Sequence, residues 1–115
     1  MIDAVGVKKS YGDRPVLRGI DLCVETEETL VIIGGSGCGK STFLKSVIGL
    51  VHPDEGSIAV DGVDITKLEK EEEIADYRRR FGYLFQEAAL FDSLSVWENV
   101  TFGLRYLTSI PPNKY

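Results

Sequence analysis

Long hydrophobic runs, cysteine and histidine are all scarce in this sequence of 115 residues. No apolar run approaches the ~18–20 residues of a membrane-spanning helix, and no signal peptide opens the chain, so we expect a protein that works in the cytoplasm. The two cysteines, Cys23 and Cys38, are too few and too oddly placed for a disulfide framework, so we expect reduced thiols. The single histidine, His52, lies beside Pro53 and is assigned no role.

Positive charge is also in deficit, because the net charge at pH 7 is −5. An acidic chain is repelled by a phosphate backbone, which argues against nucleic acid as a general partner. The composition, 43% hydrophobic and 27% charged, is ordinary for one globular domain, and the sequence has neither internal repeats nor a low-complexity segment. A phosphate-binding site must therefore be a local positive spot on an acidic protein.

A glycine-rich loop follows the apolar run 29–33 and has the spacing glycine, four residues, Gly-Lys-Ser. The segment after it carries apolar residues at helical spacing. Strand, glycine loop and helix in this order are typical of a nucleotide site, and they favour that interpretation over a glycine-rich turn that binds nothing. The predicted nucleotide-binding residues are Gly34, Gly35, Ser36, Gly37, Cys38, Gly39, Lys40, Ser41 and Thr42.

The residue types in this loop each have a physical reason. Glycines let the backbone wrap closely around a phosphate chain, so that several N–H groups point inward at the oxygens. A helix that opens near Gly39 adds roughly half a positive charge at its N-terminus. Lys40 supplies a full charge for the β- and γ-phosphates, and the Ser41 hydroxyl is placed to ligate Mg²⁺.

The rest of the chain alternates strand and helix signals, which indicates an α/β fold. We expect antiparallel strands over 1–7 and 16–24 with a turn at 10–13, a buried strand over 29–33, a helix from Lys40 to about Gly49, and a hairpin over 58–65. Further on we expect a helix over 68–80 and another buried strand over 81–85. The capping box Ser95-Val96-Trp97-Glu98 predicts the start of a last helix, which Pro111 ends.

Taken together, these motifs resemble the first half of an ABC-type ATPase, the nucleotide-binding subunit that powers a membrane transporter. The resemblance rests on Lys9-Ser10-Tyr11-Gly12, on the loop 34–42, on Gly49-Leu50 with Pro53 and Gly56, and on Phe85-Gln86. It implies a P-loop NTPase core with a parallel central sheet plus an N-terminal antiparallel β subdomain. Residues 1–115 would then be the N-terminal part of one nucleotide-binding domain.

The resemblance also implies ATP and Mg²⁺ as cofactors and gives roles to two more residues. Tyr11 would stack on adenine, and Gln86 would reach Mg²⁺ and the attacking water and sense the membrane subunit, so that Lys40 and Gln86 are the predicted catalytic residues. Without the resemblance, Tyr11 could equally pack at a turn. The implied partners are a transmembrane permease and a second ATPase subunit in a homodimer, at the inner face of the cell membrane.

The segment 84–100 looks like the Mla-type subgroup, whose ATPases drive phospholipid movement between bacterial membranes and which includes proteins of toluene tolerance. Three apolar residues in it could receive a coupling helix of the permease, namely Leu90, Phe91 and Trp97. Plain core packing is the favoured alternative for Trp97 and an equal one for the other two.

The second half of the family's nucleotide-binding domain is missing from this sequence. Nothing in it corresponds to the Leu-Ser-Gly-Gly-Gln signature, to the strand ending in Asp-Glu, or to the switch histidine. We therefore expect these 115 residues to bind nucleotide and to be hydrolytically incompetent alone, because phosphoryl transfer needs several such parts at once. Two alternatives remain: a soluble ABC ATPase of translation or DNA repair, and a small-molecule kinase, which leaves Tyr11 and Gln86 unexplained.

Overall fold

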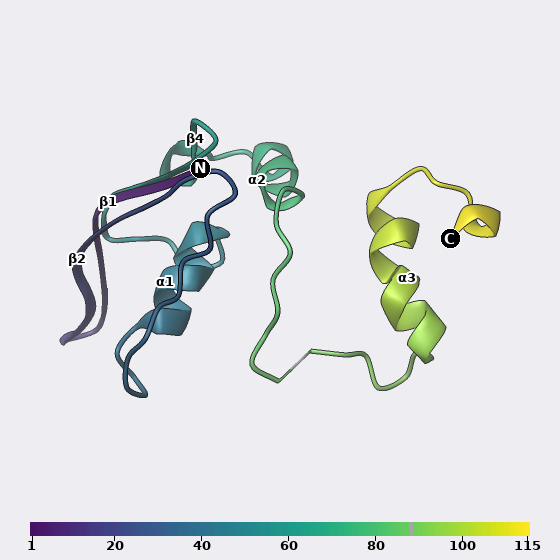
Figure 1. Cartoon of the computed structure of the whole chain (residues 1–115), viewed down its shortest axis with the longest axis horizontal. Helices are drawn as coiled ribbons and strands as arrows, with labels where there is room; N and C mark the ends of the chain where they lie inside the picture. The colour runs from purple at the N-terminus through teal and green to yellow at the C-terminus, as the bar shows by residue number, and fades with distance from the viewer. Residues whose placement is uncertain (88) are drawn as a thin grey trace. The chain divides into compact units, whose positions relative to one another are not determined.

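The computed structural model describes residues 1–87 and 89–115 of the chain (Figure 1). The described residues form two compact units, 1–82 and 83–115. The first unit carries the phosphate loop, and the second carries the helix that follows the predicted capping box.

Four strands form one antiparallel sheet in the first unit. They are β1 (Ile2–Tyr11), β2 (Arg14–Val24), β3 (Glu55–Val60) and β4 (Val63–Asp64), in the order β2-β1-β3-β4. The expected N-terminal antiparallel subdomain is therefore confirmed, although β1 and β2 run to a tighter turn at Gly12 and Asp13 than predicted. The hairpin between β3 and β4 turns at Asp61 and Gly62, both with positive φ, as the Asp-Gly signal indicates.

Helix α1 (Lys40–Val47) lies against this sheet and shares its hydrophobic core. Phe43 and Val47 are buried from the helix side, and Val7, Leu17 and Ile58 are buried from the sheet side. Apolar residues three or four apart lie on one face of a helix, which explains why this short element can pack at all. The start of α1 is thereby fixed beside β2, where the phosphate loop ends.

The C-terminal end of α1 is capped by the next helix, α2 (Glu71–Arg78), which follows the 3-10 turn η1 (Ile65–Lys67). The buried Tyr77 hydroxyl donates to the carbonyl of Val47. Arg78 donates to the carbonyls of Ile48 at 3.2 Å and Gly49 at 2.8 Å. Helix α2 is shorter than the predicted 68–80, and Tyr77 is its buried residue.

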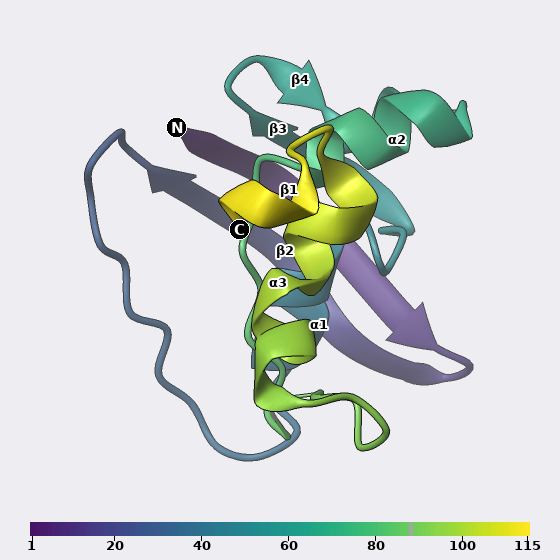
Figure 2. The same cartoon turned by 90° about the vertical axis from the view of Figure 1, so that its right-hand side faces the viewer.

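The predicted strand over 29–33 is wrong, because these residues pair with no strand among those described. Figure 2 shows them in the long open loop between the end of β2 and the start of α1. The side chains of Val31 and Ile33 are 73% and 91% exposed. An apolar run becomes a strand only where neighbouring strands accept and donate its backbone hydrogen bonds, and here it has no such neighbour.

The predicted strand over 81–85 is likewise absent, because these residues form no ladder with any described strand. In the second unit, α3 (Val96–Leu107) begins with the predicted capping box, and the 3-10 turn η2 (Pro112–Lys114) lies near the end of the chain. Core packing of Trp97 was the favoured expectation and is wrong, since this side chain is 60% exposed. Within the described residues, no helix is long and apolar enough to cross a membrane.

Candidate nucleotide-binding site

Two glycines of the phosphate loop adopt a left-handed backbone conformation just before α1. Gly37 has a φ of 78° and Gly39, which caps the helix, has a φ of 100°. The first helical bond runs from the Phe43 N–H to the Gly39 carbonyl at 2.9 Å. The N–H groups of Lys40, Ser41 and Thr42 therefore open the helix with no preceding helical carbonyl to bond, which is the arrangement that suits an anion.

Two close approaches show why the loop is built from glycine. A Cβ atom on Gly34 would lie 2.5 Å from the Sγ atom of Cys38, closer than atoms can pack. A Cβ on Gly39 would lie 3.0 Å from side-chain atoms of both Val16 and Leu17 on β2. The loop is thus folded tightly on itself and against the strand, and it retains the room for phosphate oxygens that side chains would fill.

Lys40 is held by the loop's own carbonyl oxygens. Its Nζ atom donates to the carbonyl of Gly34, and a second acceptor, the carbonyl of Gly35, lies at 3.4 Å. These acceptors are neutral, whereas bonds between an ammonium and a phosphate oxygen are charge-assisted and roughly twice as strong. A polyphosphate would accordingly replace both carbonyls as partners of Lys40.

The donor set fits a magnesium nucleotide better than a metal ion bound by protein alone. Ser41 is exposed at the first turn of α1, where its hydroxyl could ligate an ion that phosphate oxygens also hold. Among residues 1–87 and 89–115, no cluster of three or more His, Cys, Asp or Glu side chains could hold a metal. Mg²⁺ takes few protein ligands when phosphates supply the rest, and Ser41 fits that pattern.

Tyr11 lies at the end of β1 with its ring half exposed. The Nζ atom of Lys9 stands 5.5 Å from the ring centroid, in cation–π contact. Across the hairpin, Tyr11 is paired in register with Arg14, so both side chains project from the same face of the sheet. The ring is available for stacking, as the predicted adenine contact requires.

Asp54 fastens the strand end that carries Tyr11. One carboxylate oxygen accepts from the Ser10 N–H at 2.7 Å, and the other lies 3.4 Å from the Nζ atom of Lys9. The Ser10 hydrogen bond, followed by Lys9, holds the pKa of Asp54 below its usual value, so the carboxylate stays ionised at neutral pH. Nothing in the sequence pattern marked Asp54, because these contacts join residues far apart in the chain.

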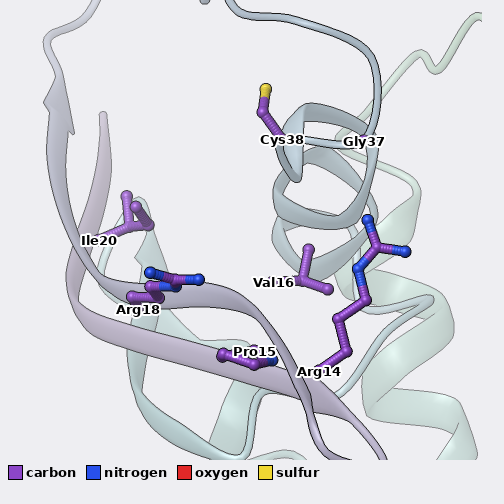
Figure 3. A pocket seen from close by; sticks show the side chains of 7 residues that line it. All are labelled: Arg14, Pro15, Val16, Arg18, Ile20, Gly37 and Cys38. Carbon is purple, nitrogen blue, oxygen red and sulfur yellow. The ribbon is translucent and has the colours of Figure 1, made fainter.

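A cavity of about 420 Å³ opens between β2 and the phosphate loop (Figure 3). It is lined from the strand by Arg14, Pro15, Val16, Arg18 and Ile20, and from the loop by Gly37 and Cys38. Figure 3 shows the Arg14 side chain extending from the strand toward Gly37. The sequence interpretation missed both arginines, because their place beside the loop depends on how β2 packs against it.

Gln86 belongs to the second unit and lies exposed in a turn. The phosphate loop and Tyr11 belong to the first unit. The structure thus brings Tyr11, the loop residues and α1 into one body, and the role of Gln86 stays a prediction from the resemblance.

Comparison with known proteins identifies the family to which this site belongs. The family model described as ABC transporter matches residues 17–114, which is most of the chain. The chain belongs to the ABC transporter family. The antiparallel sheet, the phosphate loop and α1 are therefore parts of an ABC ATP-binding cassette.

Three curated relatives are named for the transport of different compounds. The chain is 42% identical over 104 residues to a probable ribonucleotide transport ATP-binding protein, mkl, of Mycobacterium tuberculosis, covering 90% of this chain and 29% of the relative. It is 40% identical to the spermidine/putrescine import ATP-binding protein PotA of Haemophilus influenzae, covering 91% and 27%. It is 43% identical to the sn-glycerol-3-phosphate import ATP-binding protein UgpC 1 of Rhizobium johnstonii, covering 87% and 26%. The chain thus spans less than a third of each of these relatives.

The fold of this chain is also similar to solved structures of ABC ATP-binding proteins. The ATP-binding cassette MJ0796, in a dimeric post-hydrolysis state bound to ADP and Pi, matches with a TM-score of 0.88 and 29% identity, covering 99% of this chain and 52% of that one. The structure of cbiO1 from Clostridium perfringens, part of the ABC transporter complex cbiONQ, matches with a TM-score of 0.81 and 29% identity, covering 98% and 45%.

Proposed function

We propose that this chain binds ATP with Mg²⁺ at the phosphate loop, as the nucleotide-binding part of an ABC transporter ATPase. The observation that carries the proposal is the loop itself, closed by Lys40 onto its own carbonyls and anchored at Gly39 against Val16 and Leu17. Membership of the ABC transporter family supports ATP as the nucleotide.

Each loop residue has a defined task in this proposal. The free N–H groups at the start of α1 donate to phosphate oxygens, and Lys40 leaves the carbonyls of Gly34 and Gly35 to bind the β- and γ-phosphates. The Ser41 hydroxyl and the phosphates hold the magnesium ion, which neutralises charge on the phosphate chain. Tyr11 stacks on the adenine, a contact worth about 1–3 kcal/mol for a base on an aromatic ring.

In the whole protein, ATP hydrolysis would drive transport through a permease, with two ATPase subunits acting as a homodimer and Gln86 relaying between nucleotide and permease. The dimeric MJ0796 cassette and the cbiO1 subunit of a transporter complex support this arrangement. The exposed Leu90 and Phe91 of the second unit, together with Trp97, offer apolar surface for such a permease. These 115 residues alone would bind nucleotide without measurable turnover.

The cargo that we propose is phospholipid, on the resemblance of segment 84–100 to the Mla-type subgroup. The three relatives described above are named for a ribonucleotide, polyamines and a sugar-alcohol phosphate, so they do not support this choice. ATP-dependent transfer of a fluorescent phospholipid between vesicles by the whole transporter is the expected result. Transfer of spermidine or sn-glycerol-3-phosphate without lipid transfer would contradict it.

The test of nucleotide binding is the variant Lys40→Ala, with Lys45→Ala in the last turn of the same helix as its matched control. A charge-assisted contact contributes about 1.5–3 kcal/mol, so we expect Lys40→Ala to weaken Mg-ATP binding at least about tenfold. Isothermal titration should show the control binding like the unmodified chain. Equal affinity of all three proteins would mean that the loop is not the site.

A further inference from the structure

Several residues of β2 face the phosphate loop across a cavity. Arg14, Val16, Arg18 and Ile20 are two residues apart along the strand and line the same cavity of about 420 Å³. Pro15 lines it too, because the pairing of β2 with β1 shifts register after Pro15 and after Arg18, and such bulges break the strict alternation of side chains between the two faces. Gly37 and Cys38 of the loop line the cavity with them (Figure 3).

The two arginines bring positive charge to this cavity without a neutralising partner. In the part of the chain that the structure describes, neither Arg14 nor Arg18 has a carboxylate within ion-pair distance. Both side chains are exposed, on a protein whose net charge is −5. A guanidinium keeps its charge at every accessible pH and offers a planar set of donors that matches two phosphate oxygens.

Arg14 lies between Tyr11, which is predicted to bind the adenine, and the loop predicted to bind the phosphates. It is the register partner of Tyr11, so the stacking ring and the guanidinium leave the hairpin on the same face. The Nη2 atom of Arg14 lies 3.4 Å from the position that a Cβ on Gly37 would take, which puts it in contact range of the phosphate loop. A nucleotide that stacks on Tyr11 and enters the loop would pass this guanidinium.

We propose that Arg14 is a nucleotide-binding residue of this site, whose guanidinium binds non-bridging oxygens of the polyphosphate chain alongside Lys40. Arg18, four residues further along β2, adds positive potential to the same cavity wall without direct contact. This inference rests on the proposed function, because it adds a residue to that ATP site. The site should therefore select nucleotides by their phosphate charge more strongly than Lys40 alone would allow.

The variants Arg14→Gln and Arg14→Lys test this inference, with Arg79→Gln as the control. Arg79 lies at the end of α2, paired with Asp76, so its replacement makes the same change of net charge away from the cavity. We expect Arg14→Gln to weaken binding of ATP and of inorganic tripolyphosphate about tenfold, and Arg14→Lys to weaken both by less, because charge remains but the fork is lost. Adenosine binding should be unchanged in every variant.

The salt dependence gives a second measurement. If Arg14 contacts phosphate, the fall of ATP affinity between low and high salt should be shallower in Arg14→Gln than in Arg79→Gln. Equal ATP and tripolyphosphate affinities in Arg14→Gln and the unmodified chain would overturn the inference while leaving the ATP site intact. Failure of the unmodified chain to bind ATP would instead overturn the proposed function.

Discussion

The ammonium of Lys9 lies over the ring of Tyr11, 5.5 Å from its centroid, and the same ammonium faces the carboxylate of Asp54 at 3.4 Å. Asp54 also accepts from the Ser10 N–H, next to Tyr11 in the strand. The stacking residue is thus backed by a cation that a carboxylate holds in place. Because Lys9 lies over the ring, the proposed adenine contact would use its opposite face.

Replacing Asp54 by Ala should weaken ATP binding without affecting the phosphate subsite. Lys9 and Ser10 would lose their shared partner, and Tyr11 would lose part of its support. An exposed cation–π contact contributes about 0.5–1 kcal/mol, which corresponds to a loss of affinity of roughly twofold to fivefold. Titration with ATP and with inorganic tripolyphosphate measures the difference, and only ATP should bind more weakly.

The contribution of Asp54 to the stability of the fold should be lost at low pH. The pKa of Asp54 is lower in the folded chain than its ordinary value of 3.8, chiefly because of the Ser10 N–H. A depressed carboxylate stabilises the fold above its unfolded pKa and loses that contribution as the pH falls through the folded value. The hairpin end should therefore loosen below about pH 4. Asp54→Asn, which cannot ionise, should already lack this part of the pH dependence, whereas unchanged pH profiles would contradict the role of Asp54.

Tyr77 should make the fold sensitive to alkali. Burial raises the pKa of its hydroxyl from 10.0 to about 12, and the nearby Asp64 adds to the shift. The unfolded chain ionises first, so this contribution is fully present below pH ~10 and is lost as the pH rises to about 12, by up to about 2–3 kcal/mol. Chemical denaturation across that range measures the free energy of unfolding.

The variant Tyr77→Phe isolates this effect. It should be less stable at neutral pH by about 1 kcal/mol, because the hydrogen bond to the Val47 carbonyl is lost, and its stability should fall less between pH ~10 and ~12. Tyr11→Phe changes an exposed ring and should keep the full alkaline loss. A parallel decline of all three proteins would refute the assignment to Tyr77.

The capping box should govern the stability of α3. Ser95 accepts from the Glu98 N–H at 3.1 Å, and the Glu98 carboxylate accepts from the Ser95 N–H at 2.7 Å. Ser95→Ala should destabilise the helix by about 0.5–2 kcal/mol and speed hydrogen exchange at its first turn. Ser93→Ala, two residues earlier, serves as the control. Exchange rates that respond equally to both changes would show that the box does not hold the helix.

Several elements could be predicted correctly from short sequence motifs alone. The Asp61-Gly62 turn and the glycines around Lys40 follow from backbone conformations that adjacent residues favour, and the Ser95–Glu98 box satisfies its two backbone N–H groups within three residues. The two predicted strands at 29–33 and 81–85 failed for the opposite reason. Apolar composition indicates burial, but a ladder depends on a neighbour that the segment itself does not contain.

The surroundings of Tyr11 show the same limit within the site. Asp54 reaches Lys9 and Ser10 across more than forty positions of sequence, and Arg14 meets Gly37 only because β2 packs beside α1. Motif spacing predicted the residues that should contact the nucleotide. The residues that support them in this chain became visible only from the packing.

Bound Mg-ATP should protect Cys38 from alkylation, and Cys23 provides an internal control. Both thiols are exposed, but Cys38 lies inside the phosphate loop and Cys23 lies near the end of β2. Partial desolvation and the neighbouring Glu25 carboxylate raise the pKa of the Cys23 thiol, so each cysteine is compared with itself, with and without nucleotide. Mass spectrometry after a timed iodoacetamide pulse should show slower labelling at Cys38 alone. Because Lys40→Ala should abolish this protection, labelling that is slowed equally in that variant would indicate that ATP binds away from the loop.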